Sequence, residues 1–295
     1  MRWPFLSPTQ DLAMAQEIPV GVRMIRGANR TLGRVAPSLA SRISRRIFST
    51  PRKFAPREWE LPFEALATRE RLSSGVSVLR AGEGPPVALI HGWEGRATQF
   101  AELAPALIQR GFSVIAIDGP GHGHSRGKQS DPYRFADALL EVSAHVGSLY
   151  AAVGHSMGGG SIALALSSGL AVSRAALIAS PSSLLDVLHR FSSQMHLPPK
   201  ATAHFVRDAR RRIEARGYRT DDIEGALRTV DVPALVVHAR DDKEVPFADA
   251  ERIAGFWPGA TLLPVQRVGH RRILRDPITI AAVTEFLASG PGAPR

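Results

Sequence analysis

Short β-branched runs alternate with longer helical patterns from Val87 to Phe286, which is most of the chain. This alternation is typical of a parallel sheet covered by helices on both faces, because parallel strands need long crossover connections. Strands are predicted at Val87–His91, Ser113–Asp118, Leu149–Val153, Ala175–Ala179, Ala234–Ala239 and Ala260–Val265. Helices are predicted at Phe100–Arg110, Ser130–Val146, Met157–Gly169, Ala248–Phe256 and Ile278–Leu287. Ligands of such sheets bind beyond the carboxyl ends of the strands.

The chain has 295 residues, of which 44% are hydrophobic, so it can bury the core of one large domain with appendages. Its longest apolar runs are strand-sized and fall short of the roughly 18 residues of a membrane span. We expect a cytoplasmic protein, since residues 1–20 lack the continuous apolar stretch of a secretory signal. The absence of cysteine excludes disulfides and thiolate catalysis.

Four regions are predicted: a basic N-terminal extension at 1–64, the first part of the sheet domain at 65–180, a helical cap at 181–232 and the second part of the sheet domain at 233–295. The cap interrupts the strand–helix rhythm with an amphipathic, charge-rich segment that is too long for a simple connection. Its apolar side chains suit either the lining of a substrate pocket or packing within the cap, and the second is favoured; they are Leu184, Leu185, Leu188, Phe191, Phe205 and Ile213.

The N-terminal extension contains apolar residues at near-helical spacing from Val22 to Phe48, with arginines on the rest of the helical wheel. Pro37 is expected to divide this segment into two helices. Such a cationic amphipathic segment fits two hypotheses: weak peripheral contact with an anionic membrane surface, or packing against the rest of the protein. The second is favoured.

The formal net charge is +10, from 37 Lys and Arg against 27 Asp and Glu. We expect no nucleic-acid partner, because these basic residues are not interleaved with aromatic side chains that stack on bases. The sequence leaves the oligomeric state open.

A sharp strand-to-helix turn is predicted where the run from Gly154 to Gly159 reads Gly-His-Ser-Met-Gly-Gly, between the apolar stretch 149–153 and an alanine-rich one at 162–166. A nucleophile elbow of this kind strains the serine backbone and brings strand and helix together, so glycine is needed two residues before and two after the serine. Gly154 and Gly158 fill those positions around Ser156. The pattern alone is weak evidence, because it arises by chance in roughly one chain in ten of this length.

Four further motifs occur with the elbow, and all five follow one order along the chain. The four are Leu89-Ile90-His91-Gly92-Trp93, the run from Asp118 to Ser125 (Asp-Gly-Pro-Gly-His-Gly-His-Ser), Asp242-Lys243-Glu244-Val245-Pro246, and Gly269-His270. With these motifs, the chain resembles an α/β-hydrolase from about Val78 to Leu287. The resemblance implies an α/β-hydrolase fold, with a mostly parallel central sheet flanked by helices, a helical cap insertion and an N-terminal helical extension.

The resemblance also implies a catalytic triad. Ser156 would attack an acyl carbonyl carbon, and His270, on a loop after the last strand, would take its proton. Asp242 would orient the histidine; Asp241 and Asp186 are the rival acids, and the family spacing of acid, two residues and Val-Pro selects Asp242.

The backbone N–H groups of Trp93 and Met157 are assigned by the resemblance to the oxyanion hole, the set of donors that stabilises the negatively charged oxygen of the intermediate. His91, His122, His124 and His155 are expected to be structural, and Asp118 to organise its loop. Neither a metal nor a cofactor is required.

The favoured function is hydrolysis of a carboxylic ester or thioester through an acyl-enzyme on Ser156, with a small-molecule ester or acyl substrate. Acyl transfer, cofactor-free peroxidation and carbon–carbon hydrolysis use the same triad and stay open. A non-catalytic binding protein of the same fold is the alternative from another class.

Overall fold

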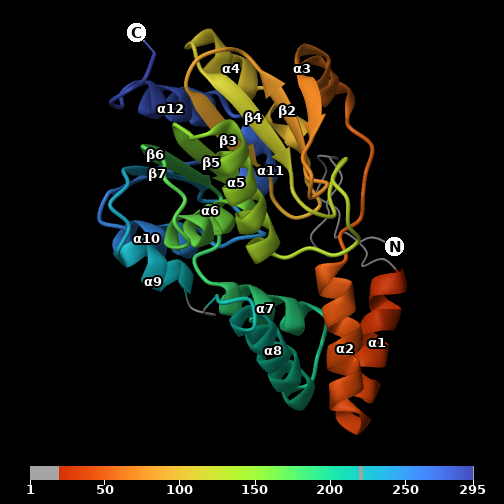
Figure 1. Cartoon of the computed structure of the whole chain (residues 1–295). Helices are drawn as coiled ribbons and strands as arrows, with labels where there is room; N and C mark the ends of the chain where they lie inside the picture. Colours follow the sequence, from red (N-terminus) through yellow and green to blue (C-terminus); the bar gives the residue numbers. More distant parts are fainter. Residues whose placement is uncertain (1–19, 219–221, 295) are drawn as a thin grey trace. The chain divides into compact units, whose positions relative to one another are not determined.

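A computed structural model describes residues 20–218 and 222–294. It contains an eight-stranded sheet in the order β1-β2-β4-β3-β5-β6-β7-β8 (Figure 1). The strands are β1 (Thr68–Arg71), β2 (Ser77–Ala81), β3 (Pro86–Ile90), β4 (Ser113–Asp118), β5 (Ala151–His155), β6 (Arg174–Ile178), β7 (Ala234–Ala239) and β8 (Ala260–Val265). The helices are α1 (Val20–Val35), α2 (Pro37–Ser49), α3 (Leu61–Leu66), α4 (Leu103–Gln109), α5 (Pro132–Val146), α6 (Met157–Ser167), α7 (Leu184–Gln194), α8 (Pro199–Glu214), α9 (Asp222–Arg228), α10 (Phe247–Phe256), α11 (Gly269–Arg272) and α12 (Pro277–Ala288), with short 3₁₀ helices η1 (Glu58–Glu60), η2 (Ala97–Phe100) and η3 (Ile273–Arg275).

The sheet is mostly parallel, as predicted. Strand β3 pairs in parallel with β4 and β5, and the parallel pairing continues through β6 and β7 to β8. The antiparallel pairs are β1 with β2 and β2 with β4. All six predicted strands are present, shifted by at most two residues. The hairpin of β1 and β2 was not predicted, because β1 reads Thr-Arg-Glu-Arg and has no apolar alternation to mark a strand.

Both faces of the sheet are covered. Successive residues of β3 point to opposite faces, yet all from Val87 to Ile90 are fully buried. On one face, Val87 and Leu89 share a cluster with residues of α4 and α12. Helices α5, α6, α9 and α10 pack successively against one another, and α6 and α10 contact β5 to β8 (Figure 1). This double cover explains the continuous apolar strands.

Two of the covering helices begin with the same Asp-Pro pair. Asp131 precedes α5 and accepts the Arg134 N–H at 2.9 Å, and Asp276 precedes α12 and accepts the Thr279 N–H at 2.9 Å. The aspartate satisfies an N–H that has no partner within the helix, and proline tolerates the first helical position because it has no N–H to satisfy. The chain therefore specifies where these two helices begin.

Residues 20–49 and 184–218 form a compact unit of their own, which we call the helical unit. Its four helices are α1, α2, α7 and α8, and Pro37 begins α2 as predicted. Phe48 of α2 packs edge-on against Phe191 of α7, with ring centroids 4.8 Å apart, and against Phe205 of α8, at 5.7 Å. Phe191 and Phe205 thus pack inside the helical unit, as the favoured reading expected.

Polar contacts also tie α1 to the end of α7. The Asn29 amide, which is buried, donates to the Met195 carbonyl at 2.9 Å, and Arg26 Nε donates to the Gln194 carbonyl at 2.7 Å. These carbonyls lie where α7 ends, so they lack partners within the helix. Residues separated by 166 positions in sequence therefore satisfy each other's hydrogen bonds.

The structure groups the chain differently from the predicted division into extension and cap. Helices α1 and α2 join α7 and α8, whereas residues 50–64 and α9 belong to the second compact unit, which holds the sheet. Phe63 of α3 is buried in the sheet cluster, and α9 packs on α6 and α10. No helix of the described residues is both long and apolar enough to cross a membrane.

Two glycines of α1 provide a matched test of the helical unit. A Cβ at Gly33 would lie 2.9 Å from the Cγ of the rigid Pro198 ring, whereas a Cβ at Gly27 meets nothing within 4 Å. Gly27→Ala should stabilise the unit by about 1 kcal/mol through helix propensity, and Gly33→Ala should destabilise it through the clash. Urea unfolding followed by circular dichroism measures both. Equal stabilisation by the two variants would contradict the packing of α1 on Pro198.

Candidate active site

Ser156 is the single residue between β5 and α6, and its backbone is strained. Its φ is 53° and its ψ is −121°, in the left-handed region that residues other than glycine rarely adopt. Its N–H donates to the Ile178 carbonyl of β6 at 2.8 Å, which holds the turn in place. Such strain persists only where the surroundings over-determine it, and it presents the serine hydroxyl at the carboxyl end of β5.

The three glycines around the turn have no room for a side chain. A Cβ at Gly154 would lie 2.6 Å from the backbone of Gly158, and one at Gly158 would lie 2.6 Å from the His91 carbonyl. A Cβ at Gly92 would lie 2.8 Å from the Cβ of Ser156. Strand, helix and the loop after β3 therefore approach so closely that only glycine fits.

Ser156, His270 and Asp242 are brought together across 114 and 28 positions of sequence. His270 Nε2 lies 3.0 Å from Ser156 Oγ, and His270 Nδ1 lies 2.7 Å from Asp242 Oδ2. The carboxylate can only accept, so Nδ1 carries a proton and donates it, which leaves Nε2 of the neutral ring to accept the serine O–H. The histidine is thus oriented to remove a proton from Ser156.

The Asp242 carboxylate is completely buried and held by several donors. Its Oδ1 accepts the N–H groups of Glu244, at 2.8 Å, and Val245, at 2.9 Å. Burial by itself raises the pKa of Asp242, but hydrogen bonds from His238 and His270 and from the Val245 N–H outweigh it, so the pKa lies below its ordinary value. The acid therefore stays ionised beside His270.

The two rival acids lie elsewhere. Asp241 is exposed and accepts the backbone N–H of Gly269 at 3.3 Å, while Asp186 belongs to α7 of the helical unit. Of the three acids, Asp242 is the one that contacts His270 in the described part of the chain. The spacing to Val-Pro had selected the same residue.

The two expected oxyanion donors flank Ser156. Met157 is the first residue of α6, so its N–H belongs to the group that has no acceptor within the helix. Trp93 follows Gly92, whose backbone approaches Ser156 as described above. The next residue, Glu94, has a φ of 57° and a nearly buried carboxylate that accepts Arg52 Nε at 3.0 Å and its Nη2 at 2.9 Å. This bidentate pair fixes the loop that carries Trp93.

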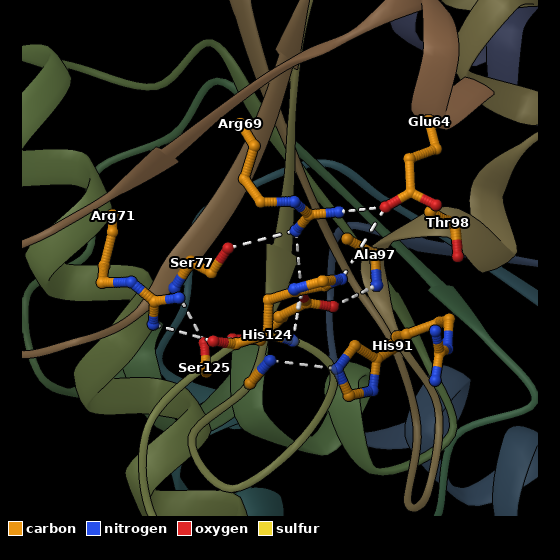
Figure 2. Close-up of polar contacts among 12 residues, drawn as sticks. Glu64, Arg69, Arg71, Ser77, His91, Ala97, Thr98, His124 and Ser125 are labelled. Atoms are coloured by element: carbon orange, nitrogen blue, oxygen red, sulfur yellow. Dashed lines mark hydrogen bonds and ion pairs between the residues drawn. The ribbon is translucent and has the colours of Figure 1, made fainter. Parts of the chain in front are cut away.

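Asp118 organises the neighbouring loops. It accepts the Ala97 N–H at 2.8 Å and the His124 N–H at 2.9 Å, and it pairs with Arg69 at 3.2 Å. Figure 2 shows Arg69 reaching Glu64 on its other side, at 2.6 Å. Among the described residues, none of these contacts of Asp118 involves Ser156 or His270.

His91 connects the two loops that end β3 and β4. Its Nδ1 donates to the Gly92 carbonyl at 2.6 Å, and its Nε2 accepts the Gly119 N–H at 3.0 Å. Figure 2 shows the His91 ring accepting a backbone N–H. Both ring nitrogens are therefore used, in one tautomer. Burial lowers the pKa of His91 to about 4, so the ring remains neutral and keeps this pattern.

Two further histidines contact the triad, and sequence reasoning gave neither a role there. His155 Nε2 donates to the backbone carbonyl of His270 at 2.8 Å, which holds the His270 loop against β5. His238 Nε2 lies 3.0 Å from the Val245 carbonyl and 3.4 Å from Asp242 Oδ2. Arg52, in the predicted extension, was missed as well. The contacts of Arg52 and His155 have no local sequence signal, because they join segments that are far apart in the sequence. His238 and Asp242 are four residues apart, but no motif marks His238.

Comparisons with known proteins identify the family of this chain. Residues 87–283 match the family described as "Alpha/beta hydrolase family". The chain is 26% identical over 247 residues to a pimeloyl-(acyl-carrier protein) methyl ester esterase of Stenotrophomonas maltophilia (strain K279a), covering 70% of this chain and 94% of the relative. It is 28% identical over 220 residues to a non-heme haloperoxidase of Rhodococcus erythropolis, covering 59% and 80%.

Solved structures share the fold. An esterase from Rhodococcus sp. ECU1013 aligns with a TM-score of 0.57 and 19% identity, covering 76% of this chain and 99% of the esterase. At this identity the likeness concerns the fold alone. The relatives thus include esterases and a haloperoxidase on one scaffold.

Buried neutral histidines make the stability depend on pH. Burial lowers the pKa of His91 to about 4 and those of His122 and His155 to about 3. In the unfolded chain each takes a proton near pH 6.5, so the unfolded state binds more protons between pH 6.5 and 4. The unfolding free energy should therefore fall as the pH is lowered through this window, by about 1.4 kcal/mol per pH unit for each histidine.

The variant His122→Asn tests this linkage. Asparagine can replace His122 Nδ1 as the donor to the Pro120 carbonyl, which lies at 3.1 Å, but it cannot titrate. The slope of unfolding free energy against pH, from urea titrations between pH 6.5 and 4, should become shallower by about one proton. An unchanged slope would mean that His122 binds a proton in the folded protein.

Proposed function

The chain belongs to the alpha/beta hydrolase family, and on this premise we propose that it is a serine hydrolase that cleaves a carboxylic ester through an acyl-enzyme on Ser156. The observation that carries the proposal is the continuous chain of hydrogen bonds from Ser156 Oγ through His270 to the buried Asp242 carboxylate, at 3.0 and 2.7 Å. A serine hydroxyl needs such a base to become a nucleophile near neutral pH.

In the first step, Ser156 Oγ attacks the ester carbonyl carbon while its proton passes to His270 Nε2. The carbonyl oxygen becomes negatively charged, and the N–H groups of Met157 and Trp93 stabilise it. Asp242, ionised and bonded to Nδ1, stabilises the positive charge on the imidazole. When the tetrahedral intermediate collapses, His270 returns the proton to the leaving alcohol, and the acyl group stays on Ser156.

In the second step, a water molecule attacks the acyl carbon and gives a proton to His270 Nε2. Collapse of the second intermediate releases the carboxylic acid and restores the Ser156 hydroxyl. The base must return to the same position for both steps, and the bond from His155 to the His270 carbonyl supports that position. The strained Ser156 backbone keeps the acyl group at the strand end, next to the donors.

The relatives support an ester as the substrate class and favour one second candidate. An esterase acting on a pimeloyl methyl ester and a non-heme haloperoxidase both resemble this chain over most of their own length. Peroxidation without a cofactor fits the same triad when hydrogen peroxide, in place of water, attacks the acyl-enzyme and releases a peracid. The two functions differ in the acceptor of the acyl group and share every residue named above.

Reaction with a fluorophosphonate probe tests whether Ser156 is an activated nucleophile. The intact protein should form a covalent adduct on Ser156, identified by mass spectrometry of the modified peptide, and Ser156→Ala should form none. The absence of an adduct in protein with a native circular dichroism spectrum would favour the non-catalytic binding protein.

Neighbouring aspartates offer a matched test of the orienting acid. Asp242→Asn should slow hydrolysis of p-nitrophenyl acetate by on the order of 10⁴-fold, because the amide favours the wrong histidine tautomer. Asp241→Asn and Asp186→Asn should keep turnover within a small factor of the unmodified protein, since His270 Nδ1 is bonded to Asp242 and Asp241 is bonded to the Gly269 N–H. Near-normal turnover of Asp242→Asn, with a large loss in Asp241→Asn or Asp186→Asn, would assign the orientation of His270 to that other acid.

A further inference from the structure

The positive charge of the protein is concentrated in the helical unit. Residues 20–49 and 184–218 contain fourteen Arg and Lys against three Asp and Glu, a net charge of +11. Residues 50–183 and 222–294, which hold the sheet and the candidate active site, contain twenty against twenty-one, a net charge of −1. The excess of positive charge in the chain, +10 overall, therefore comes from the helical unit.

The first two helices carry this charge with no acid to offset it. From Val20 to Ser49 there are seven arginines and no Asp or Glu. Five of the arginines are exposed, and none of the five forms an ion pair with another described residue: Arg23, Arg30, Arg34, Arg42 and Arg46. Other exposed arginines do pair with a carboxylate, as Arg80 does with Glu70 at 3.3 Å.

Exposed apolar side chains lie among these arginines. Met24 and Val35 of α1 are 70% and 78% exposed, and Leu39 and Ile43 of α2 are 46% and 42% exposed. On the helical wheel of α1, Arg23, Arg30 and Arg34 form one line, and Met24 and Val35 form a second line about 100° around the helix. On α2, Leu39 and Ile43 lie within about 60° of Arg46. Each helix thus has an exposed face, which we call its exposed stripe, that carries both arginines and apolar side chains, while its opposite side packs within the helical unit.

The electrostatics within the unit show that the positive charges are close together. Burial and then the neighbouring Arg212 lower the pKa of Arg45, against a partial opposing effect of Asp208. Burial and then the charges of Arg30 and Arg26 lower the pKa of His196. Crowded cations of this kind favour an anionic partner, because the partner removes their mutual repulsion.

We propose that the exposed stripes of α1 and α2 form a docking surface for an anionic phospholipid membrane. The arginines would bind lipid phosphates, and the four apolar side chains would enter the boundary between headgroups and acyl chains. The two helices lie side by side (Figure 1), and α1 is roughly 24 Å long at 1.5 Å per residue, which suits a flat partner.

A nucleic acid fits this surface less well. Single strands are bound by aromatic side chains that stack on bases, and residues 20–49 contain no Trp or Tyr, with Phe48 packed inside the helical unit. Duplex backbones are bound by charge alone, so Met24 and Val35 would gain nothing by being exposed there. A lipid surface can bind both the arginines and the apolar residues, so a membrane fits this surface better than a nucleic acid does.

The test is co-sedimentation of the full chain with vesicles at physiological salt. The protein should bind vesicles of phosphatidylcholine mixed with phosphatidylglycerol and should bind pure phosphatidylcholine far more weakly. The double variant Arg34→Gln with Arg42→Gln should lose about thirty-fold in affinity for the anionic vesicles, because each arginine near the surface contributes about five-fold. Leu39→Ser with Ile43→Ser should lose at least about ten-fold, because less apolar area enters the interface.

Matched variants in the sheet unit control for charge and hydrophobicity in general. Arg80→Gln with Arg110→Gln also removes two positive charges. Leu66→Ser with Ile278→Ser removes two exposed apolar side chains, which are 57% and 63% exposed. Both should bind like the unmodified protein. Circular dichroism of every variant checks that the helices are retained.

Three outcomes would overturn the proposal. The first is failure of the unmodified protein to bind anionic vesicles. The second is equal losses in the helical-unit variants and their controls. The third is a loss confined to the arginine variant, together with equally tight binding of a short DNA duplex measured by fluorescence anisotropy, which would assign the surface to polyanions in general. Fluorophosphonate labelling of Ser156 is independent of each outcome, so the proposed function stands or falls separately.

Discussion

The candidate active site depends on the left-handed backbone of Ser156. A serine in this conformation is held by its N–H bond to Ile178 and by the close approach of β5, α6 and the loop after β3. That approach leaves no space for a Cβ at Gly92, Gly154 or Gly158. The same compression puts the serine hydroxyl, the first N–H of α6 and the loop of Trp93 at one end of the sheet, so the nucleophile and its expected oxyanion donors are positioned by one constraint.

The second requirement is that the loops around the serine keep their shape, and buried histidines provide much of this rigidity. His91 bridges the loops after β3 and β4, and His155 holds the loop of His270. Burial lowers the pKa of both rings, so each remains neutral with one fixed tautomer. His91 and His155, which the sequence predicted to be structural, therefore support the loops around His270.

The two compact units differ in their physical character. The sheet unit is close to neutral and carries the buried, hydrogen-bonded site, whereas the helical unit carries a net charge of +11 and two exposed cationic stripes. The helical unit combines two segments that are far apart in the sequence, residues 20–49 and 184–218. Asn29 and Arg26 of the first segment donate hydrogen bonds to carbonyls at the end of α7 in the second. The N-terminal helices are thus an integral part of a folded unit, and their outer surface carries both arginines and exposed apolar side chains.

Periodicity was enough to predict the parallel sheet and six of its strands, and glycine spacing predicted the turn at Ser156, because both patterns follow from local backbone geometry. The resemblance to the α/β-hydrolase family added His270 and Asp242, and the family spacing to Val-Pro selected Asp242 over Asp241. Only the tertiary structure showed the polar β1 strand in the sheet, the pairing of α1 and α2 with α7 and α8, and the contacts of Arg52, His155 and His238 around the site. The contacts of Arg52 and His155, and the packing of α1 and α2 with α7 and α8, join distant positions, so no local pattern predicts them. The His238–Asp242 contact and the pairing of β1 with β2 are closer in sequence, but their energies come from burial and hydrogen bonds that exist only once the chain is folded.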